Sequence, residues 1–236
     1  MARQERGDEV SARDEIFATI RRSLHVTGAE EPRRLAVRSR LEQHPSGVIP
    51  ARGQGELAEQ ITTFRAEAER AGATVAVVAS PSEIPGEIAR YLRELNLPAT
   101  VIMGADARLT GLPWAETALD ISFGPSDGHD LNAVSAAFAG VAETGTLALA
   151  SGPDNPTTLN FLPDNHIVVL AAEDVVGDLE SVFARARARY GANAMPRTLN
   201  FITGPSRSAD IEQTLLFGAH GPRRLHVVLS GDPGSR

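Results

Sequence analysis

The sequence predicts an α/β protein in which a mostly parallel sheet is flanked by helices and preceded by a helical arm. From residue 55 onward, short apolar runs rich in β-branched residues alternate with helical patterns, which is typical of parallel sheets. The first 52 residues differ, because they carry ten arginines against eight acidic residues in a chain whose net charge is −7. We therefore expect an N-terminal helical arm and connector at 1–52 and one domain at 53–236.

The arm is expected to begin with one amphipathic helix over residues 9–24. Ile16, Ile20 and Leu24 recur at intervals of four and would share one face of that helix. The prolines and glycines of residues 26–55 predict a long connector that lies over the surface or across a partner.

The elements of the domain follow from hydrophobic spacing. A helical stripe that starts at Leu57 should end at Gly72, and the apolar run 73–79 predicts a buried strand. Ser80 marks the start of the next helix, which Pro85 delays by a few residues. The remaining expected elements are strands at 100–103, 118–123, 146–150, 166–171, 198–202 and 225–229, and helices after Asn132, over 175–191 and over 208–216.

Composition excludes several classes of function. The chain of 236 residues has no cysteine, so it can form no disulfide and cannot ligate an iron–sulfur cluster through its own thiolates. All 23 basic residues are arginine, which removes lysine Schiff bases and the Walker-A lysine. The net charge of −7 and the 5% aromatic content argue against nucleic-acid binding. No targeting signal or membrane span is expected, so we predict a cytoplasmic protein.

Three polar turns beside expected strands are the candidate functional segments. They are residues 142–146, residues 159–166, and residues 204–212 together with 218–222. Ligands of open α/β sheets bind at strand ends, and polar loops on a rigid sheet usually carry function. We therefore expect these segments to converge in space.

The first turn offers one carboxylate and two hydroxyl groups. Glu143 lies among small residues and can act as a base or nucleophile, or can instead pin the turn by hydrogen bonds to backbone amides. Thr144, Gly145 and Thr146 complete this candidate ligand-binding turn.

The third turn suits a carboxylate ligand. A Gly-Pro-Ser turn that runs into a helix leaves free N–H groups, and Arg207 can bind a carboxylate at two points. Asp210 would oppose a phosphate there. The alternative is an ordinary helix cap by Ser206 or Ser208.

Two histidines, His166 and His220, lie beside these turns and are candidate ligand-binding residues. A hydrolytic triad of Ser206, Asp210 and His220 is disfavoured, because the G-x-S-x-G elbow is absent. The loop around His129 is acidic, but neither it nor the other histidines match a tight metal pattern, so no metal is predicted.

Together these segments resemble the LUD domain family, specifically its lactate utilisation protein C branch. The resemblance rests on AETGTLAL at 142–149, LNFLPDNHIVVL at 159–170 and TGPSRSADIEQTLLFGAHGP at 203–222. One departure is Ser208, where the family more often has threonine. The resemblance implies a fold similar to the superfamily of ribose-phosphate isomerase, glucosamine-phosphate deaminase and CoA transferases (NagB/RpiA/CoA transferase-like). It also implies a three-protein system that oxidises L-lactate to pyruvate with iron–sulfur partner subunits.

Three hypotheses follow. In the first, the chain is the cluster-free subunit of that system, without cofactor or redox activity of its own, which binds a small carboxylate or completes a partner's site. In the second, it is a stand-alone enzyme on a CoA-transferase-like fold, with Glu143 as acid/base or acyl acceptor. In the third, it senses a ligand or assists assembly without catalysis.

Overall fold

The computed structural model describes residues 11–192, 194–208 and 216–231. The chain divides into two units, Met1–Gly47 and Val48–Arg236, and each is described by itself. The predicted boundary after residue 52 stays a prediction.

Over residues 11–47, the part of the first unit that is described, the chain forms two helices, α1 (Ala12–Ser23) and α2 (Glu31–Gln43). The side chain of Ser11 accepts a hydrogen bond from the backbone N–H of Asp14 and caps α1, which confirms the predicted first helix over its described residues. The connector predicted over 26–55 is partly helical, because α2 forms within it. Pro32 stands in the first turn of α2, where a missing N–H costs no hydrogen bond. No side chain of either helix is buried.

The second unit is built on a six-stranded sheet in the order β1-β12-β7-β4-β2-β3, with every neighbouring pair parallel. This confirms the predicted α/β class with a mostly parallel sheet. The helix expected after Asn132 is wrong, because that segment is β4, a wholly buried strand between β2 and β7. The strands are β1 (Thr74–Val78), β2 (Thr100–Met103), β3 (Asp120–Phe123), β4 (Asn132–Ala136), β7 (Asn165–Ala171) and β12 (Arg224–Ser230).

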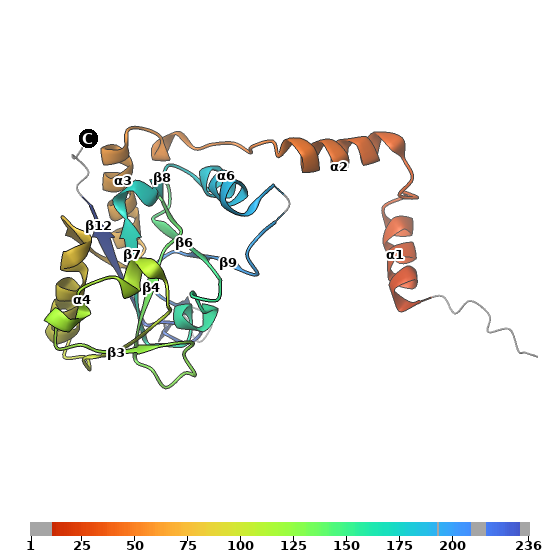
Figure 1. Cartoon of the computed structure of the whole chain (residues 1–236). Helices are drawn as coiled ribbons and strands as arrows, with labels where there is room; N and C mark the ends of the chain where they lie inside the picture. Colours follow the sequence, from red (N-terminus) through yellow and green to blue (C-terminus); the bar gives the residue numbers. More distant parts are fainter. Residues whose placement is uncertain (1–10, 193, 209–215, 232–236) are drawn as a thin grey trace, which may run out of the picture. The chain divides into compact units, whose positions relative to one another are not determined.

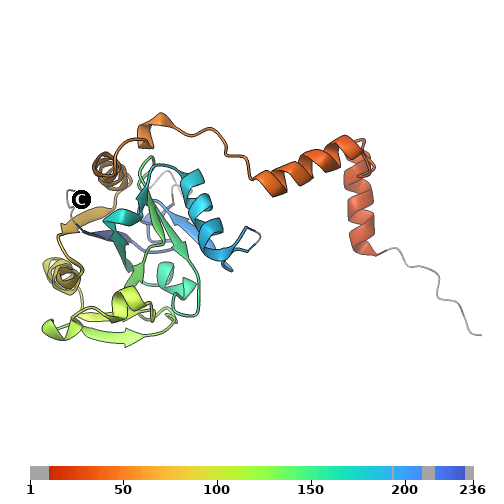
Figure 2. The same ribbon diagram turned by 45° about the horizontal axis from the view of Figure 1, so that its top comes forward.

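Different layers cover the two faces of this sheet. On one face, α4 (Ile84–Glu94) and α5 (Ala107–Thr110) pack on alternate side chains of the strands, such as Ile167 and Val169 of β7. On the other face, α3 (Leu57–Arg70) and a second sheet cover Val168 and Leu170. Figure 1 and Figure 2 both show α4 on one side of the domain and α6 (Leu179–Tyr190) on the other.

The second sheet has four strands in the order β8-β5-β6-β9 and was not predicted as a separate layer. Its strands are β8 (Val175–Val176), β5 (Ala139–Val141), β6 (Thr146–Ala150) and β9 (Leu199–Ile202). Helix α6 buries Val182 and Ala186 against its outer face. The expected helix over 175–191 therefore begins later, at Leu179, because Val175 and Val176 pair in parallel with β5.

The expected helix over 208–216 is wrong at both of its described ends. Residues Arg207–Ser208 form β10 and pair in antiparallel register with Leu216–Phe217, which form β11. Residues 209–215 lie outside the described part of the chain.

Short 3-10 helices complete the fold, at Ala51–Gly53 (η1), Pro81–Glu83 (η2), Trp114–Glu116 (η3), Thr157–Asn160 (η4) and Ala172–Asp174 (η5). Within the described ranges, none of the helices has the length and apolar character needed to cross a membrane.

Candidate functional site

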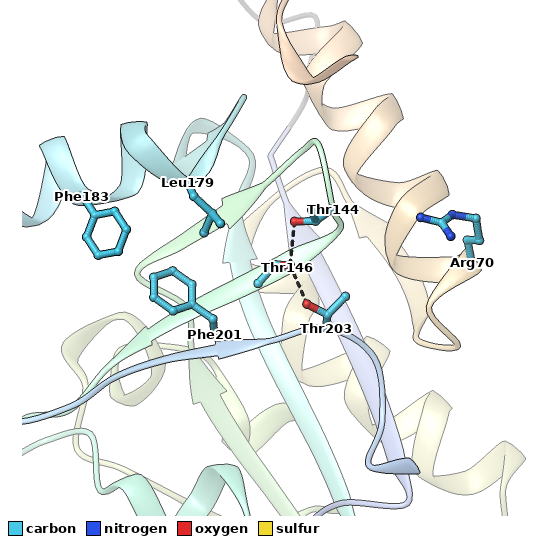
Figure 3. Close-up of a pocket in the computed structure, with 7 residues that line it drawn as sticks. All are labelled: Arg70, Thr144, Thr146, Leu179, Phe183, Phe201 and Thr203. Carbon is cyan, nitrogen blue, oxygen red and sulfur yellow. Dashed lines mark hydrogen bonds between the residues drawn. The ribbon is translucent and has the colours of Figure 1, made fainter. Parts of the chain in front are cut away.

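Two neighbouring cavities in the second unit are both lined by Phe201. The larger, of about 540 Å³, is shown in Figure 3 and is lined by Arg70, Thr144, Thr146, Leu179, Phe183, Phe201 and Thr203. The smaller, of about 240 Å³, is lined by Asn160, Phe161, His166, Phe201, Ile202, Gly204, Pro205, Ser206, His220, Gly221, Pro222 and Leu225. The three predicted turns thus all contribute to this pair of cavities.

Three threonine hydroxyls form a chain in the larger cavity. Thr144 Oγ1 lies 2.7 Å from Thr146 Oγ1, which lies 2.6 Å from Thr203 Oγ1 (Figure 3). Three hydroxyls carry three protons, and two mutual hydrogen bonds use only two of them. One proton is therefore left for another acceptor. Arg70, which is ion-paired with Glu67, supplies positive charge at the same cavity.

Gly145 lets the β5–β6 hairpin approach α3 closely. Its φ is +62°, and a Cβ atom there would lie 2.2 Å from the backbone nitrogen of Ala68. Gly204 likewise lets the third turn approach the end of α3 closely, because a Cβ atom there would lie 2.2 Å from the carbonyl oxygen of Ala71. The end of α3 thereby positions both turns.

Glu143 is buried, but it lines neither cavity. Its Oε1 accepts a hydrogen bond of 3.3 Å from the backbone N–H of Leu179, the first residue of α6. Its own N–H donates to the carbonyl oxygen of Gly177 at 3.1 Å. These contacts are those of a carboxylate that pins a turn and complements a helix N-terminus. A catalytic role for Glu143 stays a prediction.

His166 lies in the smaller cavity and is only 1% exposed. Its Nε2 is 3.0 Å from Ser135 Oγ, which in turn donates to Asn160 Oδ1 at 3.2 Å. Its Nδ1 is buried and has no hydrogen-bond partner within the described part of the chain. Burial lowers the pKa of His166 from 6.5 to about 3, so the imidazole is neutral at physiological pH.

Ser206 and His220 lie together at the same cavity. The backbone N–H of His220 donates to Ser206 Oγ at 3.4 Å, and that of Ser206 donates to the carbonyl oxygen of Pro222 at 2.8 Å. Arg207 points elsewhere, because its guanidinium donates to the carbonyl oxygen of Ala71 at the end of α3. Asp210 lies outside the described residues.

The smaller cavity opens at the amino edge of the central sheet. His166 and Leu225 are each the second residue of a strand and lie opposite one another in the pairing of β7 with β12. Ligands of open parallel sheets usually bind at the opposite, carboxyl edge. Here an ion-pair network and a loop occupy that edge.

The network at the carboxyl edge centres on Asp106 and Arg108. The Arg108 guanidinium donates to Asp106 Oδ2 at 2.7 Å and to the carbonyl oxygen of Ala137 at 2.6 Å. Burial raises the pKa of Asp106, but hydrogen bonds from Arg108 and Asn155 outweigh this and lower the pKa to about 2. The loop that contains Asp154 covers Gly104, where a Cβ atom would lie 2.1 Å from the Asp154 carbonyl oxygen.

Sequence reasoning assigned no role to several residues of the two cavities and their hydrogen-bond chain, and five of them illustrate why. Arg70 and Thr203 lacked a motif of their own. The link from His166 to Ser135 was hidden because Ser135 was placed in a helix instead of β4. The remaining two are Phe201 and Asn160, which stood in predicted segments without an assigned role.

Residues 133–230 match the family model described as LUD domain. An uncharacterised protein of Neisseria meningitidis serogroup B is 38% identical over 94 residues, or 40% of each chain. A protein named lactate utilization protein C from a Geobacillus species is 37% identical over 93 residues, or 39% of each chain. The chain thus aligns with only about two fifths of the length of these relatives.

A solved structure supports the same relationship. The crystal structure of a DUF162 family protein from Deinococcus radiodurans superposes with a TM-score of 0.57 at 26% identity, and covers 75% of this chain and 100% of that one. The predicted resemblance to the LUD domain family and to its lactate utilisation protein C branch is therefore confirmed over the matched part of the chain.

Proposed function

We propose that this chain, which carries a LUD domain at residues 133–230, is the cluster-free component of a lactate utilisation system. In this proposal, the cavity of His166, Ser206 and His220 binds a small carboxylate or completes the site of a partner subunit. One observation carries the proposal: the segments that resemble the family, at 142–149, 159–170 and 203–222, together supply most of the lining of two adjacent cavities.

The groups around the smaller cavity suit a small hydroxylated carboxylate. Ser206 can donate its hydroxyl proton, and the exposed ring of His220 can donate an N–H to a carboxylate oxygen. A volume of about 240 Å³ accommodates a molecule of lactate size.

The oxidation itself is assigned to partners. Conversion of lactate to pyruvate removes two electrons and two protons, and side chains supply no acceptor for the electrons. A chain without cysteine cannot hold an iron–sulfur cluster by thiolates. We therefore propose that iron–sulfur subunits accept the electrons and that this chain contributes binding and positioning.

Reconstitution tests this function. The full chain is combined with cysteine-rich partner proteins from the same genome, and lactate-dependent reduction of an electron-accepting dye is followed. We expect turnover only when all components are present, and at least a tenfold loss for the double variant Ser206→Ala/His220→Ala. His129→Ala is the control, because His129 is an exposed histidine that lines neither cavity. Full turnover without this chain, or by this chain alone, would refute the proposal.

A further inference from the structure

We infer that His166 is the specificity-determining residue of the smaller cavity, where it accepts a hydrogen bond from a ligand hydroxyl and disfavours a carbonyl group. The inference rests on the proposed function and deepens it. It assigns the site to 2-hydroxy acids in preference to the corresponding 2-keto acids.

The hydrogen bonds around His166 fix its tautomer. The hydroxyl of Ser135 has one proton, which it donates to Asn160 Oδ1 at 3.2 Å. At its contact of 3.0 Å with His166 Nε2, Ser135 Oγ must therefore act as the acceptor. Nε2 carries the N–H, and a neutral imidazole with Nε2 protonated has a bare lone pair on Nδ1.

The imidazole keeps this form at physiological pH because burial lowers its pKa to about 3. His226, the other buried histidine, also has one ring nitrogen without a hydrogen bond to any described residue: its Nδ1 lies 2.7 Å from Thr74 Oγ1, and its unbonded Nε2 faces the carboxylate of Glu87 at 3.4 Å rather than a cavity. His166 Nδ1 has no partner among the residues that the structure describes, although buried polar atoms in folded proteins nearly always have one. A ligand group that donates a hydrogen bond would supply the missing partner.

His166 is placed to meet such a ligand. It lines the cavity together with Ser206 and His220, and its Nε2 is already committed to Ser135. Nδ1 is therefore the ring nitrogen left unpaired, and because it is buried, a ligand hydroxyl has to enter fully against the His166 ring to reach it. Ser206 and His220 provide donors for the carboxylate of the same ligand.

This arrangement distinguishes an alcohol from a ketone. The hydroxyl of a 2-hydroxy acid donates a hydrogen bond to Nδ1. The carbonyl oxygen of a 2-keto acid has only lone pairs, which repel the lone pair of Nδ1. A site built to accept a hydrogen bond discriminates against analogues that lack the donor, because its buried acceptor is then left unpaired. The weak basicity of His166 makes it a residue that positions the hydroxyl and does not remove its proton.

Binding of three carboxylates to the full chain tests the inference. L-Lactate, pyruvate and propionate share a carboxylate and nearly the same size, and differ in the group on the second carbon. We expect L-lactate to bind at least tenfold more tightly than either of the others in calorimetric titrations. His166→Phe should bring the three affinities within about threefold of one another, which is less than 1 kcal/mol. His226→Phe is the matched control and should retain the preference, because His226 lies outside the cavity.

Nitrogen NMR of the protein labelled in its histidine rings gives a second, independent result. We expect the Nε2–H tautomer of His166 in the unliganded chain, and a change at Nδ1 when L-lactate is added. Ser135→Ala removes the acceptor for Nε2–H with little change in volume, and it should reduce the preference for L-lactate even if His166→Phe does not fold.

The outcomes separate the inference from the proposed function. Equal binding of L-lactate and pyruvate to the unaltered chain, or an Nδ1–H tautomer, would overturn the role of His166 and leave the carboxylate site intact. If none of the three carboxylates binds, the carboxylate site and the inference both fail. Reconstitution with partners then tests the role in lactate utilisation separately.

Discussion

Asp106→Asn is expected to destabilise the domain at neutral pH and to have little effect in strong acid. The carboxylate of Asp106 accepts hydrogen bonds from the backbone N–H and the guanidinium of Arg108, at 2.9 and 2.7 Å, and from Asn155 Nδ2 at 3.0 Å. Burial raises the pKa of Asp106, but these donors outweigh it and lower the pKa from 3.8 to about 2.

The lowered pKa sets both the sign and the size of the effect. Because the pKa is lower in the folded state than in the unfolded chain, ionised Asp106 stabilises the fold above pH 3.8, and this contribution is lost as the pH falls toward 2. At about 1.4 kcal/mol per pKa unit, the contribution is roughly 2 kcal/mol. The asparagine variant cannot ionise and lacks this contribution at every pH.

Urea denaturation of both proteins across this pH range measures the difference in free energy of unfolding. We expect about 2 kcal/mol at pH 7 and less than about 0.5 kcal/mol near pH 2. Asp120→Asn is the control, because Asp120 is exposed on the edge strand β3, and it should stay within about 0.5 kcal/mol of the unaltered chain. A difference that is the same at every pH would refute the electrostatic reasoning and would assign the loss to packing.

Three further substitutions test the turns around the cavities. Gly145→Ala should lower the free energy of unfolding by at least about 1 kcal/mol, because an alanine there has to adopt a left-handed backbone. Gly152→Ala is the control and should leave the free energy of unfolding almost unchanged, because no atom of the described residues lies near the position of its Cβ. Glu143→Gln should keep the reconstituted turnover and lose roughly 0.5–1 kcal/mol of stability at the start of α6; a folded but inactive variant would favour the catalytic alternative. Arg207→Ala should lower stability by about 1 kcal/mol through the lost hydrogen bond at the end of α3. Unchanged stability with lost carboxylate binding would instead support Arg207 as the carboxylate-binding residue.

Several strands of the two sheets could be predicted because they are short apolar runs. The strands at Thr100–Met103 and Thr146–Ala150 have the predicted bounds. The strand at Asn132–Ala136 was missed because its small residues carry no β-branched pattern, and its pairing with β2 and β7 outweighs their local preference. The two-residue strand at Val175–Val176 depends on a partner far along the chain and leaves no periodic signal.

The candidate site was predictable only to the level of its segments. The polar turns were identified because each combines glycine or proline with polar residues beside an apolar strand. The partners of those residues depend on tertiary pairing. Ser135 lies next to His166 only because β4 and β7 pair in parallel, with Ala133 opposite His166.

The position of His166 within the sheet divides the smaller cavity into a rigid part and an adaptable part. His166 lies on β7, which pairs with β12 on one side and β4 on the other, so its backbone belongs to the centre of a continuous parallel ladder. Ser206 and His220 come from loops outside that ladder. Amide hydrogens at the centre of such a ladder exchange with solvent only through large openings of the domain, whereas loop amides exchange through local ones. Binding of a ligand should therefore slow amide hydrogen exchange at residues 204–206 and 218–222. The amides of β7 should exchange slowly both with and without the ligand.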